Sequence, residues 1–327
     1  MIYKCRNCGA NAIYSPEKQS MYCPYCDSVD CEELSPGQGM QVCNNCGAEI
    51  NPGDYRSVVK CEACDSYIIF EERTSGEYEP RLIIPFKMGK KQAQALLKKE
   101  FGKRPFLPSD FLSEAKLDQI EGMYVPYFMY DFDCDYMFRG TGHIVRSWRQ
   151  GDYQYTETSI YRIERDMNIN FEKVPVDASI AMADDIMDLL EPYSYGLLEP
   201  FDTKYLSGFA AEKYNMSSSE LEPRAIKKAK ADARALMDQT LTRYSSIHDR
   251  QDNANFRTQA DNYSLLPVWN YTYTYRGKPY PFKINGQTGK MSGKPPVSIP
   301  KVIASGLTVF LSLAAIGGLW NMIMGVI

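Results

Sequence analysis

The chain has 327 residues, of which 24% are charged and 13% aromatic, and its net charge is −4. This composition is typical of a folded globular protein and excludes a disordered or collagen-like chain. At this length we expect about two to three domains, and the slight negative charge argues against a protein that binds nucleic acid through bulk charge.

The ten cysteines are grouped, since nine precede residue 65 and eight of these form CxxC pairs. No hydrophobic stretch opens the chain, so we expect no signal peptide and an N-terminal part that stays in the reducing cytoplasm. Paired cysteines in a reducing compartment indicate metal binding before disulfide formation.

The pairs belong to a duplicated module of the form C-x2-C-x14-C-x2-C. The first copy, expected at residues 1–34, contains Cys5, Cys8, Cys23 and Cys26. A shift of 38 residues gives the second copy, expected at residues 40–72, which contains Cys43, Cys46, Cys61 and Cys64. Residues 35–39 between the copies have the composition of a linker.

Each copy is predicted to be a zinc ribbon, and the chain to bind two Zn²⁺ ions. Four thiolates from two tight knuckles form the tetrahedral set that zinc prefers, and Gly9 and Gly47 let the backbone turn around the metal. A module of about 30 residues has too little core to fold alone, so the metal would supply folding energy. With no open ligand position the role is structural, and iron in a rubredoxin-like site is the alternative.

Two cysteines lie outside the repeat. Cys31 and Cys134 are expected to be small buried apolar side chains, although Cys31 follows Cys26 closely enough to be a spare ligand or a redox thiol.

Charge indicates what the ribbons contact. Residues 1–72 carry eleven acidic and five basic side chains, and each zinc–thiolate centre would add two more negative charges. Such a surface repels phosphate, so we expect protein partners rather than nucleic acid.

Residues 80–297 mix helical and strand patterns, which predict an α+β domain. Helices are expected at residues 90–101, at 177–190 and from about 219 to 244, the last opened by a capping-box pattern. Tyrosine-rich segments with alternating polarity predict antiparallel strands at 124–136, 153–163 and 265–284, with a hairpin turn at Asn285-Gly286.

The final segment, residues 302–327, contains no Asp, Glu, Lys or Arg. As a helix it would extend about 39 Å, more than the roughly 30 Å of a bilayer core, so we expect a single transmembrane helix. The lysines that precede it place the N-terminal body in the cytoplasm by the positive-inside rule: Lys283, Lys290, Lys294 and Lys301. Ala314 and Gly318 form a small-xxx-small pair suited to helix packing, a spacing that chance explains equally well.

The fold class is therefore expected to be multidomain, with two small β zinc ribbons, an α+β body and one C-terminal transmembrane helix. No catalytic constellation accompanies these parts. Asp131, Asp133 and Asp135 would share one strand face, but Tyr136 and Gly142 replace the glycine and glutamate of a calcium loop, so a solvated face is expected.

Two further patterns also fail to indicate catalysis. The segment from Gly286 to Lys290 resembles a phosphate-binding loop, yet Ile284 stands at its first glycine and Met291 at its Ser/Thr. Neither histidine lies in a catalytic motif: His143 and His248. We expect that the protein is not an enzyme.

One helix carries a run of cations: Arg224, Lys227, Lys228, Lys230 and Arg234. The expected role is a solvated helix face, and contact with anionic lipid headgroups is the alternative.

The sequence resembles the bacterial TFIIB-type zinc ribbon-containing membrane proteins, found mainly in Gram-positive bacteria. The resemblance covers nearly the whole chain and includes the paired ribbons and the segments at residues 84–87, 121–127, 174–177, 190–193, 265–269 and 285–290. Some members are labelled as primosomal helicase relatives, but this chain has no Walker A motif. Relatives are sometimes encoded beside phage-shock protein A and SPFH-domain proteins, which implies a membrane-stress assembly.

The expected function is a membrane-anchored cytoplasmic adaptor or scaffold that recruits protein partners to the membrane. The resemblance implies a membrane or peripheral membrane partner, such as a phage-shock A-like or SPFH-domain protein, and the terminal helix implies contact with membrane lipid. The alternative is a membrane-tethered regulator that binds nucleic acid.

Overall fold

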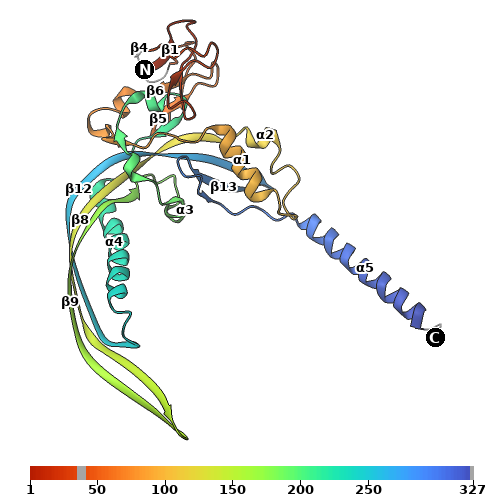
Figure 1. The fold of residues 1–327 in the computed structure, drawn as a ribbon. Coiled ribbons are helices and arrows are strands. Elements are labelled where there is room, and N and C mark those ends of the chain that lie inside the picture. Colours follow the sequence, from red (N-terminus) through yellow and green to blue (C-terminus); the bar gives the residue numbers. More distant parts are fainter. Residues whose placement is uncertain (35–41, 325–327) are drawn as a thin grey trace.

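The computed structural model describes residues 1–34 and 42–324, and for residues 318, 319 and 321–324 it describes the backbone alone. It contains two four-cysteine clusters, a sheet-rich body and an apolar C-terminal helix (Figure 1). The fold class is confirmed at this coarse level. The predicted linker at 35–39 lies outside the described residues.

The first four-cysteine module, residues 1–34, contains two small two-stranded sheets. Strand β1 (Ile2–Cys5) pairs antiparallel with β4 (Cys31–Leu34), and β2 (Ile13–Ser15) with β3 (Ser20–Tyr22). The second four-cysteine module, residues 42–72, contributes the antiparallel pair β5 (Arg56–Lys60) and β6 (Tyr67–Ile69).

One ten-stranded sheet joins the second module to the body. Its main order is β10-β7-β12-β8-β11-β5-β6, with β9 on β8 and the pair β13 and β14 beyond β12. The strands not yet given bounds are β7 (Leu82–Ile83), β8 (Glu121–Gln150), β9 (Tyr153–Asp177), β10 (Glu199–Pro200), β11 (Ala210–Glu212), β12 (Ser246–Tyr275), β13 (Lys278–Asn285) and β14 (Met291–Ser292).

Three strands are unusually long, since β8 and β12 have 30 residues each and β9 has 25. Figure 1 shows that they curve together as one arc. The helix α4 (Ser218–Thr240) lies on the concave side of this arc. The predicted helix is present, but its capping box joins Ser217 and Glu220, two residues before the predicted pattern of Ser219 and Glu222, and the helix ends at Thr240 and not near 244.

The helix α4 approaches the sheet closely because its inner stripe is built mainly from alanine. Every fourth position is buried: Leu221, Ala225, Ala229, Ala233 and Met237. They pack against large aromatic side chains of the sheet, including Tyr130, Phe132 and Phe138. Small residues on the helix therefore match large residues on the strands.

Helices cover both faces of the sheet. The helix α1 (Lys90–Phe101) has the predicted bounds and buries Ala93, Leu97 and Phe101 in the same core cluster as Phe132. The short helix α2 (Glu114–Leu117) adds Leu117 to that cluster. The helix α3 (Asp184–Leu190) packs on the opposite face of β8. The β8 side chains in this contact alternate along the strand with those of the first core cluster: Met123, Val125, Tyr127 and Met129.

Three sequence predictions need correction in the body. The helix expected at 177–190 begins only at Asp184, because Asp177 ends β9 opposite Tyr127. The strand expected at 265–284 is divided between β12 and β13 by a turn at Arg276 and Gly277, both with positive φ. The expected antiparallel strands are joined by two short parallel pairings, β11 with β8 and β12 with β7.

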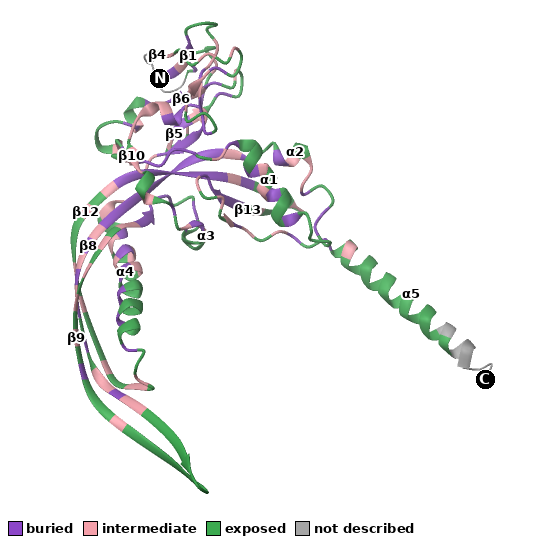
Figure 2. Ribbon diagram, in the orientation of Figure 1, coloured by how far each residue is buried: buried purple, intermediate pink, exposed green. Residues whose placement is uncertain are grey.

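The apolar terminal helix α5 (Ile299–Met324) extends away from the body, and it is long and apolar enough to cross a membrane (Figure 2). Apart from the half-buried Lys301, its described side chains are exposed, with Phe310 at 67% and Leu311 at 63%. The helix starts three residues before the predicted segment, and residues 325–327 of that segment lie outside the described residues.

Candidate metal centres and their junction with the body

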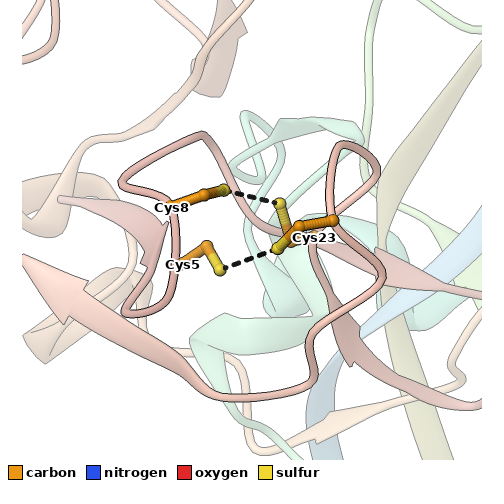
Figure 3. Close-up of side chains that lie close together, drawn as sticks. Cys5, Cys8 and Cys23 are labelled. Carbon is orange, nitrogen blue, oxygen red and sulfur yellow. Dashed lines mark hydrogen bonds between the residues drawn. The ribbon is translucent and has the colours of Figure 1, made fainter.

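Each module brings its four predicted cysteines into one cluster. The sulfur atoms within a cluster all lie within 4.8 Å of one another, and these are the two potential metal-binding groups among the described residues. Figure 3 shows Cys5 and Cys8 on one turn of the chain converging with Cys23 from another. The first cysteine of each pair is buried, while Cys8 and Cys46 reach the surface.

The sulfur separations fit a tetrahedral ion. Four sulfurs at about 2.3 Å from a central zinc lie roughly 3.8 Å apart. The closest pairs are Cys5–Cys26 at 3.6 Å, Cys8–Cys23 at 3.5 Å, Cys43–Cys64 at 3.6 Å and Cys46–Cys61 at 3.8 Å. Both clusters could therefore hold a metal ion, and each offers four protein ligands.

Four knuckles shape the clusters in the same way. After each pair the chain turns through a residue with positive φ: Gly9 at 71°, Asp27 at 57°, Gly47 at 76° and Asp65 at 58°. The N–H of that residue donates to the carbonyl of the first cysteine of its pair, as Gly9 does to Cys5 at 2.9 Å. Aspartate is among the few side chains that tolerate this conformation, so the exchange of glycine for aspartate preserves the turn.

Polar groups beside the sulfurs repeat together with the cysteines. The backbone of Ser28 lowers the pKa of the Cys26 thiol, and the Asn7 side chain, which donates to that sulfur at 3.6 Å, lowers it further. Burial opposes ionisation of Cys64, yet hydrogen bonds from Ser66 and Asn45 lower the pKa of its thiol to about 6. Both thiols are thus biased toward the thiolate that a metal requires.

The sequence reasoning did not assign these polar neighbours of the cysteines a role. The signal was available, because a shift of 38 carries Asn7 onto Asn45 and Ser28 onto Ser66.

The first module is attached to the body at several points. The Tyr14 N–H donates to the Ser207 carbonyl at 2.9 Å, and the Ser207 hydroxyl donates to the Ala12 carbonyl at 2.7 Å. The Tyr14 ring meets Tyr205 edge-on at 5.0 Å. These contacts fix the module on the loop that leads into β11.

The second module is part of the main sheet. In β5, Val58 and Arg56 pair with Ala211 and Glu212 of β11, which in turn pairs with β8. The terminal amino group of Met1 donates to the Ile69 carbonyl at 2.9 Å, which joins the two modules. That the chain folds as four independent units stays a prediction, with the boundaries 1–34, 40–72, 80–297 and 302–327.

A cavity of about 630 Å³ lies where the modules meet the body. Its walls include side chains from β2, β3, β5, β6, α1 and β12: Tyr14, Tyr22, Lys60, Tyr67, Lys90 and Trp269. Aromatic walls with a few charged groups are typical of binding pockets.

The first module also exposes one aromatic side chain to solvent. Tyr25, between the ligands Cys23 and Cys26, is 79% exposed, the largest exposed fraction among the large apolar side chains of the described residues. The equivalent residue of the second module is Ala63. The two knuckle surfaces therefore differ although their metal clusters match.

Cross-strand partners occupy the three aspartates of β8. Asp131 accepts the Lys173 N–H at 2.7 Å, and Asp135 accepts from Arg257 at 2.5 Å. Asp133 accepts from Asn170 at 3.1 Å and from Gln259 at 2.8 Å. The predicted polar strand face is present and its carboxylates are engaged within the sheet.

The basic run on α4 is not a uniform solvated face. Arg224 lies 2.9 Å from Asp177, 3.0 Å from Asp184 and 2.9 Å from Asp188. Lys228 lies 3.2 Å from Asp188 and 2.7 Å from Glu191. Lys227, Lys230 and Arg234 are exposed, in agreement with the prediction.

Burial dominates the electrostatics of this network. The Asp177 side chain is 1% exposed, and burial raises the pKa of its carboxyl against the opposing charge of Arg224. Among the described residues neither Asp177 oxygen has an aligned hydrogen bond, so Arg224 holds the carboxylate by charge. Burial raises the pKa of Glu191 as well.

The remaining candidates lie apart from the clusters. Cys31 pairs with Cys5 across β1 and β4 and is half-buried, whereas Cys134 is buried under α4, as expected of a small apolar side chain. The rings of His143 and His248 lie 4.4 Å apart on neighbouring strands, a proximity that the sequence did not indicate.

Comparison with known proteins identifies a relative that matches nearly the whole chain. The chain is 36% identical over 319 residues to the uncharacterized protein YdjG of Bacillus subtilis (strain 168), and the match covers 92% of each chain. The chain belongs to the YdjG family. No family model matches this YdjG-family chain. No solved structure matches it either.

We predict that each cluster of this YdjG-family protein binds one ion independently. Cys8→Ser should lower the metal content from two ions per chain to one, because three thiolates hold a tetrahedral ion poorly. Elemental analysis of purified full-length protein measures this. The control Cys31→Ser changes a cysteine outside the clusters and should keep both ions, so loss of an ion there would contradict the assignment.

A second prediction concerns the buried charge network. Arg224→Met leaves the Asp177 carboxylate unpaired and should reduce the free energy of unfolding at pH 7 by about 3–5 kcal/mol. A buried carboxyl whose pKa is higher in the folded than in the unfolded chain binds protons more readily when folded. Lowering the pH from 7 through that raised pKa should therefore return part of the lost stability.

Urea denaturation in detergent at several pH values between 5 and 7 measures the effect. The matched control is Lys227→Met, an exposed position on the same helix, which should change stability by less than about 0.5 kcal/mol. A loss in Arg224→Met that is the same at every pH would show that the Asp177 charge is not its cause.

Proposed function

We propose that this chain is a non-enzymatic adaptor, with two zinc ribbons that present a protein-binding surface and a terminal helix that anchors the body to a membrane. The observation that carries the proposal is structural continuity. The four-cysteine modules are fixed to the sheet of the body, and the same chain ends in an exposed apolar helix.

The identity of the ion as zinc is part of the proposal. Its support is the complete four-thiolate set with tetrahedral sulfur spacing and the absence of an open ligand position in either cluster. Thiolates in a reducing compartment suit zinc, and iron would accept the same geometry.

The composition of α5 supports its insertion into a bilayer. The Thr308 hydroxyl donates to the Ala304 carbonyl at 2.6 Å, and the Ser312 hydroxyl donates to the Thr308 carbonyl at 2.8 Å. These polar groups are therefore satisfied within the helix, as the hydrocarbon core requires. The lysines that precede the helix favour a cytoplasmic body, in keeping with thiolates that must stay reduced.

The ribbon surface supports a protein partner. Acidic side chains predominate there, and Tyr25 stands exposed on the first module as tyrosines of interface hot spots do. We extend to this chain the TFIIB-type zinc ribbon resemblance, and with it a membrane-stress assembly that includes a phage-shock A-like or SPFH-domain partner.

The alternative, a membrane-tethered regulator that binds nucleic acid, has less support. Two of the five cations on α4, Arg224 and Lys228, face carboxylates of the same chain and are not available to phosphate.

The adaptor proposal predicts that recruitment and anchoring separate genetically. Tyr25→Ala should keep the protein in the membrane with both metal ions while a partner is lost, because removal of a hot-spot tyrosine costs about 2 kcal/mol, roughly 30-fold in affinity. Quantitative mass spectrometry of proteins that co-purify from solubilised native membranes measures the loss. The control is Leu189→Ala, which removes an exposed apolar side chain from α3.

A chain that ends at Ser298 completes the test. Because α5 is exposed along its described length, its removal should leave the body folded and the partner bound, with both in the soluble fraction. Recovery of nucleic acid in place of a protein, or a partner retained equally by Tyr25→Ala, would contradict the proposal.

A further inference from the structure

The hairpin of β8 and β9 continues well beyond the rest of the sheet. The last pairing of β12 with β8 joins Ser246 to His143, whereas β8 and β9 stay paired from Ile144–Ser159 to Gln150–Tyr153. Seven further residue pairs at about 3.4 Å each extend this hairpin by roughly 24 Å. We call residues 144–159 the hairpin tip.

The hairpin tip has no core of its own. The helix α4 ends at Thr240, and the segment after it reaches only the base of the tip, where Tyr244 and Arg243 contact Tyr161 and the Val145 N–H donates to the Ser245 hydroxyl at 3.1 Å. Figure 2 shows the outer part of the hairpin as mostly exposed. A bare two-stranded hairpin is only marginally stable in water, so a tip of this length indicates that something covers it.

Aromatic side chains gather on one face of the hairpin tip. Trp148 pairs with Tyr155 across the strands and Gln150 with Tyr153, which places all four side chains on the same face. The rings of Trp148 and Tyr155 stack at 5.7 Å, yet 46% and 45% of these residues remain exposed, and Tyr153 is 71% exposed. Stacking of the two rings therefore does not remove the apolar surface of the tip from solvent.

The chemistry of the tip fits the interfacial layer of a bilayer. Tryptophan and tyrosine concentrate there because their rings are amphipathic, and arginine can reach lipid phosphates while its stem stays in apolar surroundings. The tip contains two basic residues, Arg146 and Arg149, and two acidic ones, Asp152 and Glu157, so it is neutral within a chain whose net charge is −4. Val145, 45% exposed, adds apolar surface to the opposite face.

The position of the tip is compatible with the same membrane as α5. Figure 1 shows that the hairpin and α5 both lead away from the end of the molecule that carries the four-cysteine modules. A bilayer that receives α5 would therefore lie on the side toward which the hairpin extends.

We propose that the hairpin tip inserts its aromatic side chains into the headgroup layer of the membrane that α5 spans. This inference rests on the proposed anchoring by α5. The tip is a second membrane contact, which fixes the tilt of the body and holds the ribbons away from the bilayer.

Tryptophan quenching in the full-length chain tests the proposal. The protein is reconstituted into vesicles of phosphatidylethanolamine and phosphatidylglycerol that contain a lipid brominated on its acyl chains near the headgroup. The chain has three tryptophans, and Trp269 is 4% exposed in the core, where its N–H donates to the Met88 carbonyl at 3.0 Å. Its emission is a constant background that also reports an intact fold.

The variant Trp320→Phe reports Trp148, and its emission should be quenched by the brominated lipid and protected from aqueous iodide. Trp148→Phe combined with Trp320→Phe should lose that response. Trp148 that stays open to iodide in vesicles would overturn the proposal. Protection from iodide without quenching by the lipid would also overturn it, since protein and not lipid would then cover the tip.

The variant Trp148→Phe alone reports Trp320 in α5 and tests the anchor separately. Quenched Trp320 with unquenched Trp148 would refute the hairpin contact and leave the anchor in place. Unquenched Trp320 would refute the anchor. The hairpin contact is then judged by the Trp148 signal of the Trp320→Phe variant.

Discussion

Backbone hydrogen bonding along β8 is the constraint on which the rest of the structure depends. On one edge β8 pairs with β12 from Glu121 to His143, and on the other it pairs first with β11 and then with β9. The strand β11 carries β5 of the second module, and β12 carries β13, whose far end leads to α5. The second cysteine cluster thus lies on the same sheet that leads through β13 toward the apolar helix, which gives this module a defined position relative to the helix.

The cysteine clusters matter to this framework because the modules contain little apolar core. Among the described residues, the apolar cluster around Cys43 and Cys61 buries four further side chains: Ile2, Ile50, Ile68 and Phe70. Ile2 comes from the first module, so the two modules share this core. An ion in each cluster would supply the missing free energy of folding and would hold β5 and β6 in the geometry that extends the sheet. Metal binding, sheet extension and presentation of the module surface are therefore physically linked.

The local features could be predicted from the sequence and the long-range ones could not. The cysteine sets follow from spacing alone, and the helix α1 follows from a period that buries Ala93, Leu97 and Phe101. The length of β8 beyond Tyr136 depends on partners in β9 and β12, and its outer residues do not alternate in burial. Arg224 read as a solvated cation because its partner Asp177 is distant in sequence. The function of the body stays a prediction, because its polar contacts also join residues that are distant in sequence.

Hydrogen–deuterium exchange of the full chain in lipid nanodiscs, with and without a metal chelator, tests the central claim that metal binding and the body sheet form one framework. The account predicts that chelation removes protection from β5 and β6 and weakens it in β11, while α5 stays protected in both states. Loss of both ions with unchanged protection of β5 and β6 would contradict it, since the modules would then be held by the sheet alone.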